Sequence, residues 1–342
     1  MTQADPARPY TIVGGGAIGG TLAFHLATAG HPVRIVDADA AHVAAIRDRG
    51  LVLRGAHGDR TAAMTAATPG DAETVDERVL LCVKAQATET AMSWLAPRLP
   101  AGGFVVSLQN GLNEEAIAAH VGADRIVGAF VNLFADVAEP GVIRDGGAGA
   151  LVVGEMDGEP STRVDEVVAD LQAWGPARAT RNVPGHLWAK LGFGAMLTAT
   201  ALADAPMADL VDRHRPLMYG MVAEVFAVAA ARGLRLEPFD AFEPAAYLPD
   251  ADPADRDAAT DRLTAWLRTQ PKDRSGIWRD IAVRHRPIEV HDHYGAVFAA
   301  AEADDVPTPL LRAMLTRLTA VEHGRAKMSE DHLTALEGEA RA

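Results

Sequence analysis

The 342 residues are 49% hydrophobic and 23% charged, which is the ordinary composition of a globular protein, and the length suits two domains. The formal net charge of −14 argues against a nucleic-acid backbone as partner, because such binding needs basic patches. No uninterrupted apolar stretch reaches the ~18 residues of a membrane span, and residues 1–9 form a polar, flexible tail without an apolar signal core. The one cysteine, Cys82, cannot form an intrachain disulfide. We therefore expect a soluble cytoplasmic protein.

A glycine-rich turn follows the first predicted strand, Thr11–Val13. Gly14, Gly16 and Gly19 form a G-x-G-x-x-G array, and a helical pattern follows at once. In such a unit the first glycine permits a tight turn, the second lets the backbone approach a pyrophosphate, and the third allows close packing of helix on strand. The phosphates lie at the N-terminus of the helix, where free N–H groups and the helix dipole favour negative charge. The pattern predicts a dinucleotide site built from Gly14, Gly16, Ala17, Ile18 and Gly19.

An acidic residue ends the second predicted strand, Val33–Val36. Asp37 lies about twenty residues beyond the glycines, where a carboxylate can accept hydrogen bonds from the adenosine ribose hydroxyls. The 2′-phosphate of NADP(H) would meet this negative charge, so Asp37 favours NAD(H). Asp37 could instead only cap the segment that follows, and Arg34 and Arg47 are near enough in sequence to leave NADP(H) open.

Strands alternate with helix-length segments as far as about residue 154. This order is typical of βαβ units and of a doubly wound parallel sheet with helices on both faces. Two short runs, 50–54 and 141–144, are expected to add antiparallel strands. Ligands bind beyond the carboxyl ends of such strands, so Lys84 and Asn110 are expected at the same crevice as the glycine turn, although both could be ordinary loop residues. Further strands are predicted at Val79–Val83, Gly103–Leu108, Arg125–Val131 and Leu151–Val153.

The second half of the chain has helical patterns. A loop rich in proline and aspartate is expected at 237–256. The sequence therefore predicts a Rossmann-type α/β domain at 10–179 and an all-α domain at 180–338. The apolar residues of the helical domain could bury a homodimer face, or they could all belong to its core. Helices are expected within 186–231, 275–301 and 310–336.

A lysine lies inside an almost entirely apolar helical stretch that begins at His186. Lys190 would lose proton affinity if it were buried there without a partner, and a pKa drawn toward neutrality suits a proton donor. A side chain that snorkels to solvent at the helix start is the alternative. Farther along, Ser275 and Glu289 could frame the wall of a pocket. No metal site is predicted, because one helix face does not bring together His285, His291 and His293.

Several short motifs occur in a fixed order along the chain. They are the glycine turn Gly14–Gly19, Val83–Ala85, Gln109–Gly111, Glu139–Ile143, Leu187–Leu191, Glu224, Ser275 with Glu289, and Val306–Pro309. With these motifs the chain resembles the ketopantoate reductase family (2-dehydropantoate 2-reductases) over nearly its whole length. The resemblance implies reduction of a 2-oxo acid to a 2-hydroxy acid with a nicotinamide cofactor. It also implies an active site between a Rossmann domain and a helical domain.

The resemblance implies roles for residues at matching positions. Lys190 matches a catalytic lysine that donates a proton to the developing alkoxide while hydride reaches the carbonyl carbon. Glu289 matches an active-site glutamate that orients substrate and lysine, and Ser275 matches a hydroxyl that contacts the substrate carboxylate. Asn110 would hold cofactor ribose and substrate, and Lys84 would lie near the cofactor.

Two positions depart from the family pattern. One and two turns after its lysine the family usually has asparagines that bind the substrate, whereas this chain has Gly194 and the candidate substrate contact Thr198. The loss of two amide side chains removes polar contacts that give large discrimination, so the identity of the 2-oxo acid is open. Two alternatives also stay open. One is another oxidoreductase on the same frame, such as a 3-hydroxyacid or opine-type dehydrogenase, and the other is a non-catalytic dinucleotide sensor, against which Lys190 and Glu289 argue.

Overall fold

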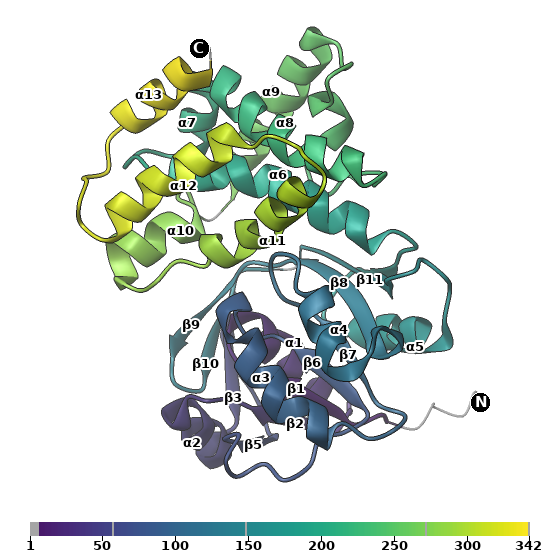
Figure 1. The fold of residues 1–342 in the computed structure, drawn as a ribbon. Coiled ribbons are helices and arrows are strands. Elements are labelled where there is room, and N and C mark those ends of the chain that lie inside the picture. Colours follow the sequence, from purple (N-terminus) through teal and green to yellow (C-terminus); the bar gives the residue numbers. More distant parts are fainter. Residues whose placement is uncertain (1–6, 57, 148, 271, 341–342) are drawn as a thin grey trace. The chain divides into compact units, whose positions relative to one another are not determined.

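The chain divides into two compact units, Met1–Val183 and Pro184–Ala342 (Figure 1). The predicted boundary lay between residues 179 and 180, and the observed division falls in the first turn of helix α6 (Val183–Thr200). Most of the predicted tail, residues 1–6, lies outside the described residues. Along the described part of the chain, no helix is both long and apolar enough to cross a membrane. The computed structural model describes residues 7–56, 58–147, 149–270 and 272–340.

A mainly parallel sheet forms the centre of the first unit. Every neighbouring pair of its strands runs parallel except one pair, β11 (Ala150–Glu155) with β8 (Ile126–Asn132). Along the chain, strands are added first on one side of the first strand and then on its other side. This is the doubly wound order, and it confirms the predicted fold class. Among the described residues the sheet has eight strands, in the order β12 (Ala177–Ala179), β11, β8, β7 (Phe104–Ser107), β6 (Arg78–Leu81), β1 (Tyr10–Val13), β2 (Val33–Val36) and β5 (Thr65–Ala67).

Helices cover both faces of this sheet. Adjacent residues of one strand, Leu80 and Leu81, belong to two different apolar clusters, because successive side chains of a strand point to opposite faces. One cluster includes Leu171 of helix α5 (Thr162–Leu171), and the other includes Met92 of helix α3 (Thr88–Leu95). The other helices of this unit are α1 (Ala17–Thr28), α2 (Ala40–Arg49), α4 (Glu114–Val121) and the short 3-10 helices η1 (Ala85–Ala87), η2 (Ala96–Arg98) and η3 (Ala123–Arg125).

A second sheet packs against α1 and corrects one expectation. The runs 50–54 and 141–144 were expected to be antiparallel additions, and each does pair antiparallel with one neighbour. They form β3 (Leu51–Gly55) and β10 (Val142–Asp145), which pair parallel to each other in a separate sheet with β4 (Gly58–Ala62) and β9 (Ala135–Glu139) at its edges. The antiparallel hairpin of β9 and β10 returns the chain in the direction of β3. A Cβ on Gly20 would lie 2.9 Å from Ile143, so glycine there lets α1 approach this sheet.

The described part of the second unit is helical. The helix expected over 275–301 is interrupted, because His285 has a φ of +50° and Pro287 follows it, and both features stop helical hydrogen bonding. The helix expected over 310–336 is likewise divided at Gly324, where φ is +67°. The elements are α6, α7 (Met207–Arg213), α8 (Arg215–Ala231), η4 (Pro244–Tyr247), α9 (Pro253–Thr269), α10 (Gly276–Arg279), the π-helical turn η5 (Asp280–Arg284), α11 (Val290–Ala303), α12 (Pro309–Glu322) and α13 (Asp331–Ala340). The predicted loop 237–256 therefore contains η4 and the start of α9.

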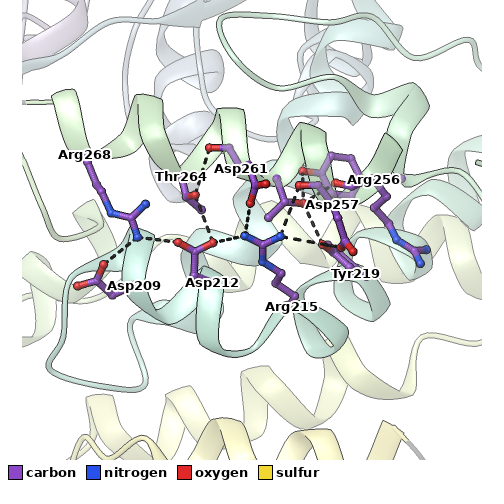
Figure 2. A network of polar contacts seen from close by, with 11 residues as sticks. Asp209, Asp212, Arg215, Tyr219, Arg256, Asp257, Asp261, Thr264 and Arg268 are labelled. Atoms are coloured by element: carbon purple, nitrogen blue, oxygen red, sulfur yellow. Dashed lines mark hydrogen bonds and ion pairs between the residues drawn. The ribbon is translucent and has the colours of Figure 1, made fainter. Parts of the chain in front are cut away.

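An ion-pair network joins α7, α8 and α9 (Figure 2). Arg215 lies 2.6 Å from Asp212 and 2.5 Å from Asp261. Arg268 lies 2.6 Å from Asp212 and 3.0 Å from Asp209. Burial opposes ionisation of Asp212, but hydrogen bonds from Arg268 and Arg215 outweigh it and lower the pKa of this carboxyl. The shared partners hold α9 against α7 and α8.

Candidate active site

The glycine turn leaves room for a phosphate group at the start of α1. Gly14 has a φ of +95°, and a Cβ on it would lie 2.7 Å from the Val83 nitrogen. A Cβ on Gly19 would lie 1.9 Å from the Gly14 carbonyl oxygen, so helix and strand require glycine at both positions. In contrast, a Cβ on Gly16 would meet no described atom within 4 Å. The partly exposed residues Gly16, Ala17 and Ile18 therefore fit the pyrophosphate of a dinucleotide.

Asp37 holds the glycine turn from one side. Its Oδ2 accepts a hydrogen bond from the Gly15 N–H at 2.7 Å, and its Oδ1 accepts one from the Asp39 N–H at 2.8 Å. The side chain is partly exposed, and each carboxylate oxygen has a second lone pair. Asp37 can therefore accept a ribose hydroxyl without giving up these contacts.

His42 holds the same turn from the other side, and no sequence pattern pointed to it. The buried imidazole Nδ1 accepts a hydrogen bond from the Gly141 N–H at 3.0 Å. The proton therefore lies on Nε2, which donates to the Gly15 carbonyl oxygen at 2.9 Å. The backbone N–H and the backbone carbonyl of Gly15 are thus both held by side chains.

The loops that hold Lys84 and Asn110 are joined by a buried amide. Gln109 Nε2 donates to the Val83 carbonyl at 2.9 Å and to the Thr88 hydroxyl at 2.7 Å. Strands β6 and β7, which precede these loops, are paired neighbours, so Lys84 and Asn110 both follow the carboxyl edge of the sheet. Both residues are partly exposed. The Gln109 bridge thus positions the two candidate cofactor contacts.

Lys190 lies on a partly exposed stripe of an otherwise buried helix. All of α6 is described, and its partly exposed positions are Pro184, Lys190, Gly194 and Leu197. Burial lowers the pKa of the Lys190 ammonium to about 8, although the negative charges of Asp240 and Glu289 act in the opposite direction. Lys190 therefore has the pKa of a proton donor that works near neutral pH.

The carboxylates of Asp240 and Glu289 supply the negative charge that acts on Lys190. Glu289 precedes α11, and its Oε2 lies 3.5 Å from the His293 Nε2. Asp240 was not expected from the sequence, because it lies in a segment that was predicted only as a loop. A tight turn presents it: the Phe242 N–H donates to the Phe239 carbonyl at 2.8 Å, and Asp240 has a φ of +47°.

Aromatic packing attaches this turn to the helix of Lys190. The ring of Phe193, on α6, has its centroid 5.8 Å from that of Phe239 and 5.3 Å from that of Phe242. Such ring pairs add to the stability that burial gives. The turn that carries Asp240 is therefore fixed next to α6, which explains its effect on Lys190.

Ser275 and Thr198 are both buried. Ser275 caps α10, with its Oγ accepting a hydrogen bond from the Trp278 N–H at 3.2 Å. Thr198 is 1% exposed and hydrogen-bonds to the Tyr294 hydroxyl, while Leu197 takes the partly exposed position of that turn. Contact of either residue with a substrate stays a prediction. Within the described residues, no group of three or more His, Cys, Asp and Glu side chains is placed to hold a metal ion.

The fold and these residues define a dinucleotide-binding protein of the doubly wound class with a lysine–carboxylate cluster in its helical unit. The family model described as "Ketopantoate reductase PanE/ApbA" matches residues 10–158, and the model described as "Ketopantoate reductase PanE/ApbA C terminal" matches residues 182–322. The chain belongs to the ketopantoate reductase family, as its motifs indicated. It is therefore a dinucleotide-dependent reductase with a nicotinamide cofactor.

Curated relatives and solved structures agree with this assignment. The chain is 28% identical to a 2-dehydropantoate 2-reductase of Mesorhizobium japonicum, with 92% of this chain and 98% of the relative covered. It is 26% identical to one of Halobacterium salinarum, with 89% and 95% covered. A PanE/ApbA family ketopantoate reductase structure from Ralstonia eutropha JMP134 has a TM-score of 0.77 and 28% identity, with 92% and 99% covered. D-mandelate dehydrogenase, solved with NADH and anilino(oxo)acetate, shares the fold with a TM-score of 0.76 at 20% identity, with 92% and 99% covered.

Proposed function

We propose that this reductase prefers NAD(H) and reduces a small 2-oxo acid to the 2-hydroxy acid, with Lys190 as the general acid. The observation that carries the proposal is a partly exposed lysine with a pKa of about 8 beside two carboxylates. A general acid works best when its pKa lies near the working pH. Members of the family that match over most of this chain are named 2-dehydropantoate 2-reductases, so a 2-oxo acid is the natural substrate class.

The residues of the helical unit would act together on the substrate carbonyl. The nicotinamide cofactor, when bound, supplies the hydride. Lys190 Nζ donates a hydrogen bond to the carbonyl oxygen and transfers its proton as negative charge develops there. Glu289 raises the proton affinity of Lys190 and orients the ammonium. Ser275 uses its oxygen to accept the Trp278 N–H, so its O–H can still donate to the substrate carboxylate.

The preference for NAD(H) follows from Asp37. Its carboxylate can accept the ribose hydroxyls and would repel a 2′-phosphate at the same place. The NADH complex of D-mandelate dehydrogenase shows that this fold can hold that cofactor. Lys84 and Asn110, at the carboxyl edge of the sheet, would contact the rest of the dinucleotide.

Replacing His42 by phenylalanine is expected to weaken NADH binding about tenfold, because the Gly15 carbonyl would lose its buried donor, which costs roughly 1–3 kcal/mol. Fluorescence titration of NADH measures this effect. The kcat at saturating NADH should stay near that of the wild type, since His42 contacts the glycine turn and not the residues proposed to act on the substrate. His120→Gln, a change at a partly exposed histidine of the same unit, is the control. Equal NADH affinities for His42→Phe and His120→Gln would show that His42 does not position the turn.

The pH dependence of the reaction tests the proposed role of Lys190. Reduction needs the protonated lysine, so kcat/KM for the 2-oxo acid should be level below about pH 8 and fall above it. Oxidation of the 2-hydroxy acid needs the neutral lysine and should rise through the same pH. Asp240→Asn removes a charge that raises the pKa of Lys190. The fall in the reduction rate and the rise in the oxidation rate should therefore both move to lower pH. Asp250→Asn, an exposed change in the same loop, should leave them in place. Coincident pH profiles for the wild type and Asp240→Asn would show that Asp240 does not raise the pKa of Lys190.

A further inference from the structure

The helix face beside Lys190 offers a substrate almost no hydrogen-bonding group. One turn beyond Lys190 the partly exposed position is Gly194, which has no side chain, and the next is Leu197, which is hydrocarbon. Backbone groups within a helix already pair with each other. A substrate that reaches Lys190 along this stripe therefore meets one charge, then a flat backbone, then an apolar side chain.

Tyr294 lies beneath Gly194, and its buried hydroxyl is engaged by the helix. The side chain is 2% exposed, and its O–H donates to the Leu191 carbonyl at 3.1 Å. A Cβ built on Gly194 would lie 3.5 Å from the same oxygen, which is ordinary van der Waals contact. Thr198 hydrogen-bonds to this hydroxyl from the other side. The polar atoms of Tyr294 and Thr198 thus satisfy each other and the helix.

We propose that Gly194 and Leu197 form a hydrocarbon-binding wall of the substrate site, and that the substrate is a 2-oxo acid whose side chain lacks a hydroxyl. This inference rests on the proposed function. A hydroxyl placed against the wall would lose its water without gaining a partner. An apolar wall rejects an added hydroxyl by at most about 100-fold, so the expected discrimination is moderate.

Two acids that differ by one hydroxyl test the proposal: 3,3-dimethyl-2-oxobutanoate and its 4-hydroxy derivative, 2-dehydropantoate. With NADH, kcat/KM for the first is expected to exceed that for the second by about 10- to 100-fold. The melting temperature with NAD⁺ and either acid, which form an unreactive complex, should rise more with the first. A preference for 2-dehydropantoate in both measurements would overturn the wall while leaving the reductase assignment intact. Failure to reduce either acid would count against the proposed function, and therefore against the proposed hydrocarbon-binding wall as well.

Variants of Gly194 separate polarity from size. Asparagine and leucine have similar shapes, and the first atom of either side chain fits at Gly194. Gly194→Asn should move the ratio of kcat/KM values at least tenfold toward 2-dehydropantoate, relative to Gly194→Leu. Equal ratios for the two variants would show that the wall does not set the preference. Tyr294→Phe tests the orientation of the hydroxyl, because a tenfold loss for 2-dehydropantoate alone would mean that this hydroxyl binds substrate and would contradict the proposal.

Discussion

Replacing Lys190 by alanine is expected to lower kcat for reduction of a 2-oxo acid at least ~100-fold, in line with the contribution of a general acid. The variant loses both the proton donor and the positive charge that stabilises the developing alkoxide. Binding of NADH should change little, because the glycine turn, Asp37 and His42 all belong to the first unit. Initial rates of NADH oxidation and a separate NADH titration measure the two effects.

Lys190→Arg separates charge from proton transfer. Arginine keeps the positive charge but does not lose its proton in this pH range. The arginine variant should therefore bind the 2-oxo acid better than the alanine variant, remain slow, and lose the fall in rate above about pH 8. Lys327→Ala, at an exposed lysine of the same unit, is the control. Turnover near the wild-type value in either Lys190 variant would contradict the general-acid role.

Replacing Asp37 by serine is expected to reduce the preference for NADH over NADPH by about 100-fold. The change removes charge-assisted hydrogen bonds to the ribose, worth roughly 1.5–3 kcal/mol, and also removes the repulsion of the 2′-phosphate. The ratio of kcat/KM values for the two cofactors, at one fixed concentration of the 2-oxo acid, gives the effect directly.

Asp39→Asn is the matched control for Asp37→Ser. It removes a charge two residues away, and its side-chain oxygen can still accept from the first N–H groups of α2 as Asp39 does. The cofactor ratio of this control should stay within about threefold of the wild type. A wild-type enzyme that prefers NADPH, or an Asp37→Ser variant with an unchanged ratio, would remove the proposed role of Asp37.

The parts of the fold that local sequence patterns determine could be predicted. The order of strand, glycine turn, helix, strand and acid specified the doubly wound sheet, because each step is a local pattern with a short connection. The interrupted helix over 275–301 could not be predicted, because His285 adopts a left-handed backbone that its residue type does not require. The pairing of β3 with β10 depends on contacts between segments far apart in the sequence.

The residues of the candidate site likewise divide into those that a local sequence pattern identifies and those that depend on tertiary contacts. Lys190 could be identified from one charge in an apolar helix, whereas Asp240 reaches it only through packing of an aromatic turn. His42 and Tyr294 also act through tertiary contacts to backbone carbonyls. Glu224, one of the family motifs, has a structural explanation: its carboxylate accepts the first N–H groups of α12 at 2.8 and 2.9 Å. A motif residue can therefore mark the fold instead of the chemistry.

This chain is expected to reduce a 2-oxo acid with NADH. The most direct test measures NADH oxidation by the wild-type protein with a panel of 2-oxo acids, with product analysis for the 2-hydroxy acid. We expect stoichiometric formation of a 2-hydroxy acid from at least one 2-oxo acid of the panel. Tight binding of NADH without oxidation by any acid of the panel would contradict the account and would favour a dinucleotide sensor or another substrate class.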